Sequence, residues 1–158
     1  MTKTAQITVN VNGEKYIEDV PLRMNLADFL RTKIGLTGTH VGCEHGVCGA
    51  CTLFLNGITA RSCLALAVQA DGAEITTIEG YELEKNATDL IKNFHNRNAL
   101  QCGYCTPGML ASSIEYIEQG NPADRVKVKE YLSGNYCRCT GYQAIVDAIC
   151  TTIEERQG

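Results

Sequence analysis

Nine cysteines are the residues of this sequence whose type and spacing could do chemistry. Cys43, Cys48 and Cys51 lie in one short segment, and Cys63 follows beyond an Asn-Gly turn. The spacing C-x4-C-x2-C with a distant fourth cysteine is the plant-type pattern for a [2Fe–2S] cluster, which takes four thiolates. Three glycines of the same segment allow the tight turns and close main-chain approach that such a loop requires. This first set therefore predicts one iron–sulfur site.

Structural zinc is the alternative for the first set. Zinc sites favour short cysteine pairs rather than a wrapped, glycine-rich loop, so the spacing favours iron and sulfide. His45 lies inside the segment and could suggest a Rieske centre. Four cysteines already complete the site, so we interpret His45 as an exposed loop residue.

The second set consists of four cysteines in two short pairs, Cys102 with Cys105 and Cys137 with Cys139. On spacing alone, zinc is a serious alternative here. Each pair precedes an expected helix, one starting at Pro107 and the other near Tyr142. Two helix N-termini would direct free N–H groups and positive dipole ends at one site. This placement suits a thiolate-bound cluster, which carries net negative charge.

The ninth cysteine, Cys150, has no partner cysteine nearby in the sequence. It lies on the last expected helix, one turn after Val146. We interpret it as a small buried hydrophobic residue and not as a ligand.

Composition limits the classes of function and favours metal ligation over disulfides. The chain has 158 residues, 44% hydrophobic and 20% charged, with a net charge of −4, so nucleic-acid and anionic-membrane roles have little electrostatic support. No stretch approaches the roughly 20 apolar residues of a membrane span, and the N-terminus lacks the apolar run of a signal peptide. We therefore expect a cytoplasmic protein, in which clustered cysteines bind metal.

The first half of the chain has the two-residue alternation of strands. Asn12-Gly13 and Asn56-Gly57 are strong hairpin signals, and Asn25 can cap a short helix. Residues 36–51 form an aperiodic loop. The expected strands are 6–11, 15–20, 52–55, 58–60 and 74–78, and a further short helix is expected over Arg61–Ala70.

After Gly80 the hydrophobic period changes to that of helices. The pattern predicts four of them, over 88–97, from Pro107 to before Gly120, over 123–132, and from near Tyr142 through Ile153. The sequence therefore predicts a mixed β/α half followed by an all-α half.

Three cysteine-bearing segments resemble the small iron–sulfur subunit of the molybdenum hydroxylases, the family of xanthine dehydrogenase, aldehyde oxidoreductase and carbon monoxide dehydrogenase. The segments are GCEHGVCGACT (residues 42–52), QCGYCTPG (101–108) and GNYCRCTGY (134–142). They occur in the family's order and at its separations, and the resemblance covers essentially the whole chain. It makes zinc a much poorer interpretation of the second set.

The resemblance implies an α+β fold, in which an N-terminal plant-ferredoxin-like β-grasp domain is followed by an all-α four-helix bundle domain. We accordingly expect a ferredoxin-like [2Fe–2S] domain over residues 1–80 and a helical [2Fe–2S]-binding domain over residues 81–158.

The resemblance also implies the function of an electron-transfer subunit of a molybdenum-dependent oxidoreductase, with no substrate chemistry on this chain. A large partner subunit holds molybdenum on a molybdopterin, a medium subunit holds FAD, and we expect a dimer of heterotrimers. Electrons pass from molybdenum to the second cysteine set, then to the first set and then to FAD.

Two residues, Gln101 and Cys139, occupy positions that approach the pterin in the family. For Gln101 a role as a local cap of the helix at Pro107 is the alternative.

Two functions of other classes compete with this one, a free-standing soluble two-cluster ferredoxin and a zinc-stabilised interaction module. The helical half argues against the free-standing ferredoxin, because an electron carrier that acts alone needs only one cluster domain. Substrate contacts belong to the large subunit, so this sequence does not specify the substrate.

Overall fold

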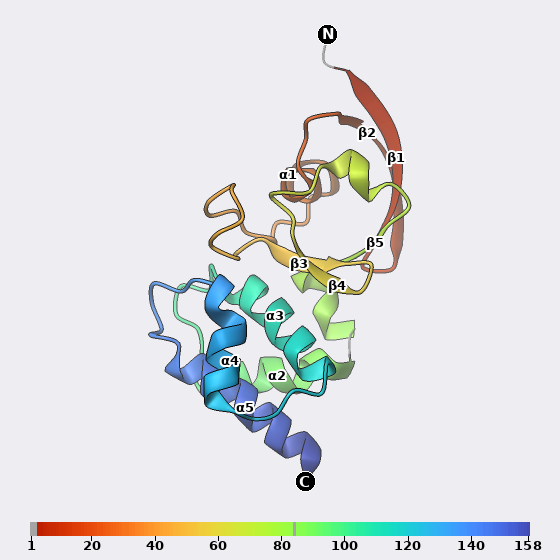
Figure 1. Cartoon of the computed structure of the whole chain (residues 1–158). Coiled ribbons are helices and arrows are strands. Elements are labelled where there is room, and N and C mark those ends of the chain that lie inside the picture. Colours follow the sequence, from red (N-terminus) through yellow and green to blue (C-terminus); the bar gives the residue numbers. More distant parts are fainter. Residues whose placement is uncertain (1–2, 84) are drawn as a thin grey trace.

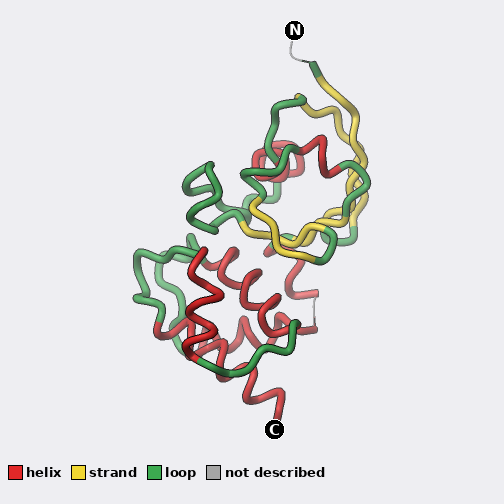
Figure 2. The backbone as a smooth tube through the Cα atoms, in the orientation of Figure 1, coloured by secondary structure: helices red, strands yellow, loops and turns green. Residues whose placement is uncertain are grey.

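The computed structural model describes residues 3–83 and 85–158 (Figure 1). A β-rich half lies at the N-terminal end of the molecule and a helical half at the C-terminal end (Figure 2). The helices and strands are β1 (Thr4–Val11), β2 (Glu14–Pro21), α1 (Leu26–Phe29), β3 (Thr52–Leu55), β4 (Ile58–Arg61), β5 (Glu74–Thr76), α2 (Lys85–Asn96), α3 (Thr106–Glu118), α4 (Arg125–Tyr131) and α5 (Gln143–Gln157). Short helical turns are Leu30–Ile34, Ala67–Ala70, Ile78–Leu83 and Leu132–Gly134.

The strands of the described residues form one mixed sheet in the order β2-β1-β5-β3-β4. β1 pairs antiparallel with β2 and parallel with β5, and β3 pairs antiparallel with both β5 and β4. Both hairpin predictions are confirmed. Asn12 and Gly13 have φ values of 52° and 83°, and Asn56 and Gly57 have 52° and 81°. Two consecutive left-handed residues fit the twist of a two-residue hairpin, and Asn-Gly adopts them at low cost.

One face of the sheet packs on α1 and forms the core of the β-rich half. Ile7, Val9 and Val11 alternate along β1 and are each at most 2% exposed, as the period of a strand requires. They pack in one cluster with Leu26 and Phe29. The predicted cap is confirmed, because Asn25 Oδ1 accepts a hydrogen bond of 2.7 Å from the backbone N–H of Asp28.

The helix expected over Arg61–Ala70 is wrong for most of its length. Arg61 ends strand β4, and only Ala67–Ala70 form a short 3₁₀ helix. The backbone between them is committed to other partners, since Leu26 N–H donates to Ala65 O and Ala67 N–H donates to Met24 O, both at 2.8 Å. These bonds hold residues 62–66, which form turns and a single bridge between Leu66 and Asn25, beside the start of α1. The last strand is also shorter than expected and ends at Thr76.

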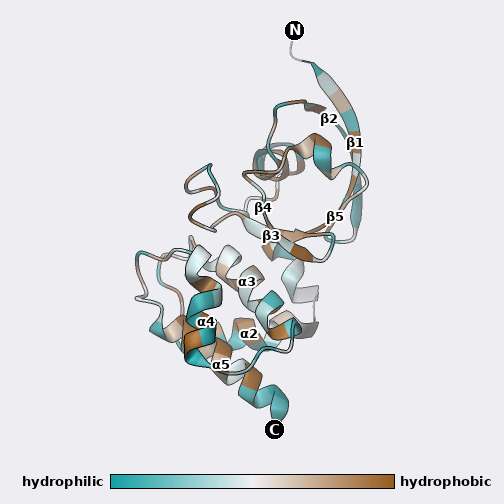
Figure 3. Cartoon of the chain, in the orientation of Figure 1, coloured by the Kyte–Doolittle hydropathy of each residue, from teal (hydrophilic) through white to brown (hydrophobic). Residues whose placement is uncertain are grey.

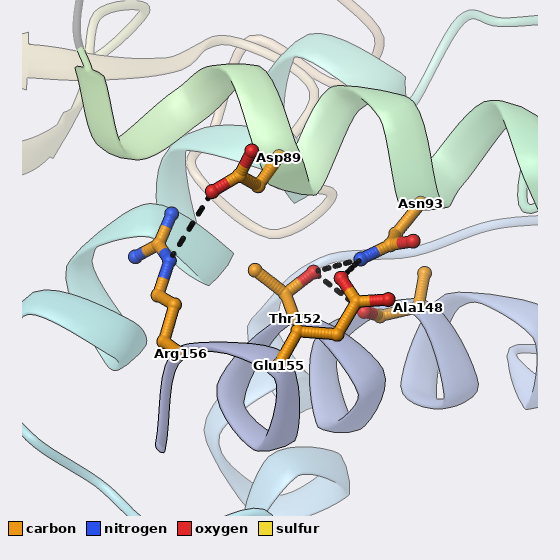
Figure 4. Close-up of polar contacts among 6 residues, drawn as sticks. All are labelled: Asp89, Asn93, Ala148, Thr152, Glu155 and Arg156. Carbon is orange, nitrogen blue, oxygen red and sulfur yellow. Dashed lines mark hydrogen bonds and ion pairs between the residues drawn. The ribbon is translucent and has the colours of Figure 1, made fainter. Parts of the chain in front are cut away.

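The four helices expected in the second half are confirmed as α2 to α5, which share one hydrophobic core. A buried polar contact fixes α2 against α5 (Figure 4). Asn93 Nδ2 donates to Thr152 Oγ1 at 3.0 Å and to Glu155 Oε2 at 2.9 Å. The polar C-terminal end of α5 projects from the bundle (Figure 3). None of the helices in the described ranges is long and apolar enough to cross a membrane.

The sheet of the first half packs directly against the helices of the second half. Phe54 of β3 belongs to the core of the helical half, where its ring lies 5.9 Å from that of Tyr81 in an edge-on arrangement. Glu115 of α3 accepts hydrogen bonds from Thr59 of β4 and from Tyr131 of α4. Burial opposes ionisation of Glu115, but these hydrogen bonds outweigh it and lower the pKa of the carboxyl. A charged side chain therefore joins the sheet to two helices.

Candidate metal centres

The first candidate site lies in the loop before β3, which has no regular helix or strand between residues 36 and 51, as expected. The turn after β4 brings the distant Cys63 to this loop. Ser62 is fully buried and anchors the segment, because its Oγ donates to Cys51 O at 2.8 Å. The four thiols contact one another in two pairs, Cys43 with Cys48 and Cys51 with Cys63.

The second candidate site draws together the two cysteine segments of the helical half. Cys139 Sγ lies 3.5 Å from Cys102 Sγ, and Cys105 and Cys137 make the other side-chain contact. Each pair therefore takes one cysteine from each segment. Cys102 and Cys139 are exposed, whereas Cys105 and Cys137 are partly buried.

This pairing fits a [2Fe–2S] cluster at each site. Four thiolates shared between two irons give two thiolates for each iron, whereas a structural zinc gathers its four ligands around one point. In the described residues, no group of three or more His, Cys, Asp or Glu side chains meets at a single point. The contacts that do form place two thiols together at each end of a four-thiol set.

Backbone N–H groups favour the thiolate form at one end of the first site. They point at Cys43 Sγ from Cys48, at 3.4 Å, and from His45 and Val47, and they lower the pKa of this thiol to about 6. Burial, together with the neighbouring Cys51, instead raises the pKa of Cys63 to about 11. Thiolates are the metal-binding form of cysteine, so the N–H groups around Cys43 prepare it for ligation.

His45 does not take part as a ligand candidate. Its side chain is exposed, and its Nδ1 contacts the carbonyl oxygen of Cys43. The interpretation of His45 as an exposed loop residue is confirmed.

Glycine is required in the first loop for space and for backbone conformation. A Cβ on Gly42 would lie 3.1 Å from Cys48 Sγ, and a Cβ on Gly49, which has a φ of +74°, would lie 2.6 Å from Gly134 O. Glycine at position 42 therefore leaves room for the side chain of Cys48, a candidate ligand. Glycine at position 49 allows the first loop to approach the backbone of Gly134 in the helical half.

Hydrogen bonds to sulfur also shape the second site. Thr140 donates to Cys137 Sγ from its hydroxyl at 3.1 Å and from its backbone N–H at 3.4 Å. Burial would raise the pKa of Cys137, but these bonds outweigh it and lower the pKa. Burial and contact with Cys137 raise the pKa of Cys105 to about 12. Sequence reasoning missed Thr140, although a threonine directly after the C-R-C segment was the available signal.

The expected helix N-termini are present at this site. Cys105 is the N-cap of α3, and Tyr142 is the N-cap of α5 with a left-handed φ of 68°. The Tyr142 hydroxyl accepts a 2.9 Å hydrogen bond from the backbone N–H of Cys137. Tyr142 is a second functional position that the cysteine spacing did not reveal.

The structure places the two candidate sites side by side. The backbone N–H of Tyr136, next to Cys137, donates to Cys48 O at 2.8 Å. On the other segment, the Tyr104 hydroxyl donates to Val41 O at 2.8 Å, and its ring stacks on His40 at 4.5 Å. Both cysteine segments of the second site therefore touch the loop of the first.

Two candidate residues remain, Gln101 at the surface and Cys150 in the core. Gln101 is exposed beside the exposed Cys102. The N-cap position of α3 is Cys105, and no side chain caps it, so a capping role for Gln101 finds no support. Cys150 is 6% exposed in the core of the helical half, on α5. Burial raises the pKa of its thiol.

Comparisons with known proteins match both halves of the chain. A family model described as "[2Fe-2S] binding domain" matches residues 77–150, and one described as "2Fe-2S iron-sulfur cluster binding domain" matches residues 33–99. The chain is 49% identical over 148 residues to the caffeine dehydrogenase subunit gamma of Pseudomonas sp. (strain CBB1), covering 90% of this chain and 87% of that protein. It is 41% identical over 158 residues to one subunit of the probable xanthine dehydrogenase of Bacillus subtilis (strain 168), covering 99% of this chain and 90% of that protein.

Solved structures have the same fold. Quinoline 2-oxidoreductase from Pseudomonas putida 86 contains a chain that is 46% identical, with a TM-score of 0.87 and 98% of both chains covered. The aldehyde oxidoreductase from Desulfovibrio gigas is 37% identical with a TM-score of 0.85, and the match covers 98% of this chain but 17% of that longer one. The expected α+β fold is confirmed by these likenesses.

Proposed function

Because the chain belongs to the family of small iron–sulfur subunits of the molybdenum hydroxylases, we propose that it conducts single electrons between the redox centres of two partner subunits. Its eight paired cysteines would hold two [2Fe–2S] clusters. Such clusters accept and release one electron at a time, which suits transfer between a two-electron oxidation at a molybdopterin centre and FAD. The observation that supports this most directly is the pairing of the thiols within each set, together with the hydrogen bond from Tyr136 N–H to Cys48 O.

We assign the ligands by site. The first cluster would be held by Cys43, Cys48, Cys51 and Cys63, and the second by Cys102, Cys105, Cys137 and Cys139.

The second site is proposed to face the large molybdopterin subunit. Cys102, Cys139 and Gln101 are all exposed there, so a partner's pterin could approach without any rearrangement of this chain. A side-chain amide has both donor and acceptor groups, which suit the mixed edge of a pterin. The first site would then face the medium FAD subunit.

The same proposal covers the division of the chain into domains and its assembly with partner subunits. We place a division between the ferredoxin-like and helical domains at about residue 80, although Phe54 packs into the helical core. We propose a dimer of heterotrimers in the cytoplasm as the assembled state.

A free two-cluster ferredoxin is the less favoured function, because relatives are named as subunits of dehydrogenases. Gel filtration of native extract distinguishes the two hypotheses. A free ferredoxin would elute as a small protein, whereas a subunit would elute together with its large partners.

We expect about four irons and about four acid-labile sulfides per chain, as two all-cysteine [2Fe–2S] centres require. Chemical iron and sulfide assays on the purified chain check this number. Electron paramagnetic resonance (EPR) of the reduced protein should show two distinct S = 1/2 signals. A composition near one zinc and two irons would disprove the assignment of the second site.

Gln101→Ala should slow reduction of the iron–sulfur centres by substrate, while both centres still assemble. The amide is exposed beside Cys102, and the change would remove its contacts to the partner's pterin. Stopped-flow reduction by substrate in the assembled complex measures the rate, with iron content assayed in parallel. An unchanged rate with a lower melting temperature would instead identify Gln101 as a purely structural residue.

A further inference from the structure

Asn135 occupies the point where the two candidate sites meet. Its side chain is 3% exposed, and it lies two residues before Cys137 of the second site. Asn135 Nδ2 donates at 3.2 Å to the carbonyl oxygen of Gly49, which directly follows Cys48 of the first site. One buried amide therefore spans the space between the two cysteine loops.

The Asn135 side chain is held in place from its other end. Asn135 Oδ1 accepts hydrogen bonds from Ser112 Oγ at 3.0 Å and from Arg61 Nη2 at 3.3 Å. Arg61 Nη2 also donates to Gly134 O at 2.9 Å, so strand β4 binds the same segment twice. A buried amide with this many partners has one orientation, in which its NH₂ group points at Gly49.

The surrounding backbone leaves little freedom for the two loops to part. A Cβ on Gly49 would lie 2.7 Å from Asn135 Nδ2 and 2.9 Å from Asn135 Cα, so the chains are already in contact. The backbone N–H of Tyr136 bonds Cys48 O in the same place. None of the three hydrogen bonds of the Asn135 side chain involves sulfur, so the residue acts on the placement of the loops and not on ligation.

We infer that Asn135 is a positioning residue that sets the spacing of the two iron–sulfur sites and thereby the rate of electron exchange between them. The inference rests on the proposed function. In this exchange one site is oxidised by one electron as the other is reduced, and no bond forms or breaks and no proton moves. Electron exchange weakens steeply with distance. A residue that holds both loops in place therefore controls the exchange rate without touching either redox centre, just as supporting residues hold a functional site at its working geometry.

The test uses three variants of the full chain with its clusters in place. Asn135→Asp keeps the size and the Oδ1 acceptor but turns an oxygen toward Gly49 O, which would push the loops apart. Asn135→Ala removes the clamp without repulsion. Ser112→Ala is the control, because it removes one hydrogen bond to the same side chain and leaves the contact of Nδ2 with Gly49 O.

Two measurements decide the outcome. One is the magnetic splitting between the two reduced centres in EPR, and the other is the rate at which an electron injected by pulse radiolysis equilibrates between them. We expect both to fall several-fold in Asn135→Asp, to fall less in Asn135→Ala and to stay unchanged in Ser112→Ala, with iron content equal to that of the unmodified chain.

Unchanged splitting and rate in both Asn135 variants would overturn the inference, and so would loss of iron from both, since Asn135 would then act in assembly. Absence of iron–sulfur signals from the unmodified chain would refute the proposed function itself, so the two failures are distinguishable.

Discussion

Replacing Cys105 with alanine should remove one of the two iron–sulfur centres and leave the other intact. Cys105 contacts Cys137 and, as the N-cap of α3, cannot be replaced by a neighbouring donor without moving the helix. Loss of one of four thiolates leaves an iron without its second protein ligand. We expect iron to fall from about four to about two per chain, with loss of one EPR signal.

Cys150→Ser is the matched control for this variant. Both thiols are shielded in the helical half, and burial raises the pKa of each. Cys150 lies on α5 in the hydrophobic core, so serine there should cost about 1 kcal/mol of unfolding free energy through burial of a hydroxyl. Its iron content and both EPR signals should stay intact. Equal iron loss in the two variants would show that global destabilisation, not ligation, explains the Cys105 result.

The sequence predicts different roles for these two cysteines, because candidate ligands are recognised by their local spacing. Cys43, Cys48 and Cys51 must share one loop whatever the rest of the chain does, and the glycines between them indicate how that loop turns. Hairpins at Asn-Gly and helices with a 3.6-residue period are similarly local signals. Thus the element types and the two cysteine sets could be inferred without a structure.

The segment after β4 could not be inferred in this way. Residues 61–70 contain several good helix formers, but their backbone groups bond to Met24 and Leu26, far earlier in the chain. Tertiary pairing overrides intrinsic propensity here, and the turn that results delivers Cys63 to its site.

The residues that join the two sites could not be inferred from the sequence either. Gly49 and Asn135 are 86 positions apart and meet through the packing of the helical half on the β-rich half. Asn135 lies in the segment GNYCRCTGY, but its type and spacing do not indicate that it contacts the first loop. The pattern thus predicts which residues could bind metal, whereas the distance between the bound groups is a property of the tertiary fold.

Gly108 lies where α3 packs against the first cysteine loop, and Gly108→Ala should weaken this packing strongly. A Cβ at this position in the first turn of α3 would lie 2.0 Å from Gly49 O and 3.1 Å from Gly49 C. Both neighbours are backbone atoms, so no side chain can rotate away. Alanine favours helix by up to about 1 kcal/mol, but overpacking here should cost about 3 kcal/mol. We therefore expect a net loss of about 2 kcal/mol in unfolding free energy, measured by chemical denaturation.

Gly120→Ala separates this effect from the general cost of replacing glycine. Gly120 has a φ of +71° and open space around its would-be Cβ, so alanine there is strained by its own backbone, at roughly 1–2 kcal/mol, with no neighbour displaced. Both variants should lose stability, but only Gly108→Ala should also reduce the magnetic splitting between the reduced centres. α3 begins directly after its N-cap Cys105 and presses Gly108 against the residue after Cys48, so one added methyl group must move a ligand segment of one site away from the other. If the splitting were the same in both variants, the contact between Gly108 and Gly49 would not control the spacing of the sites.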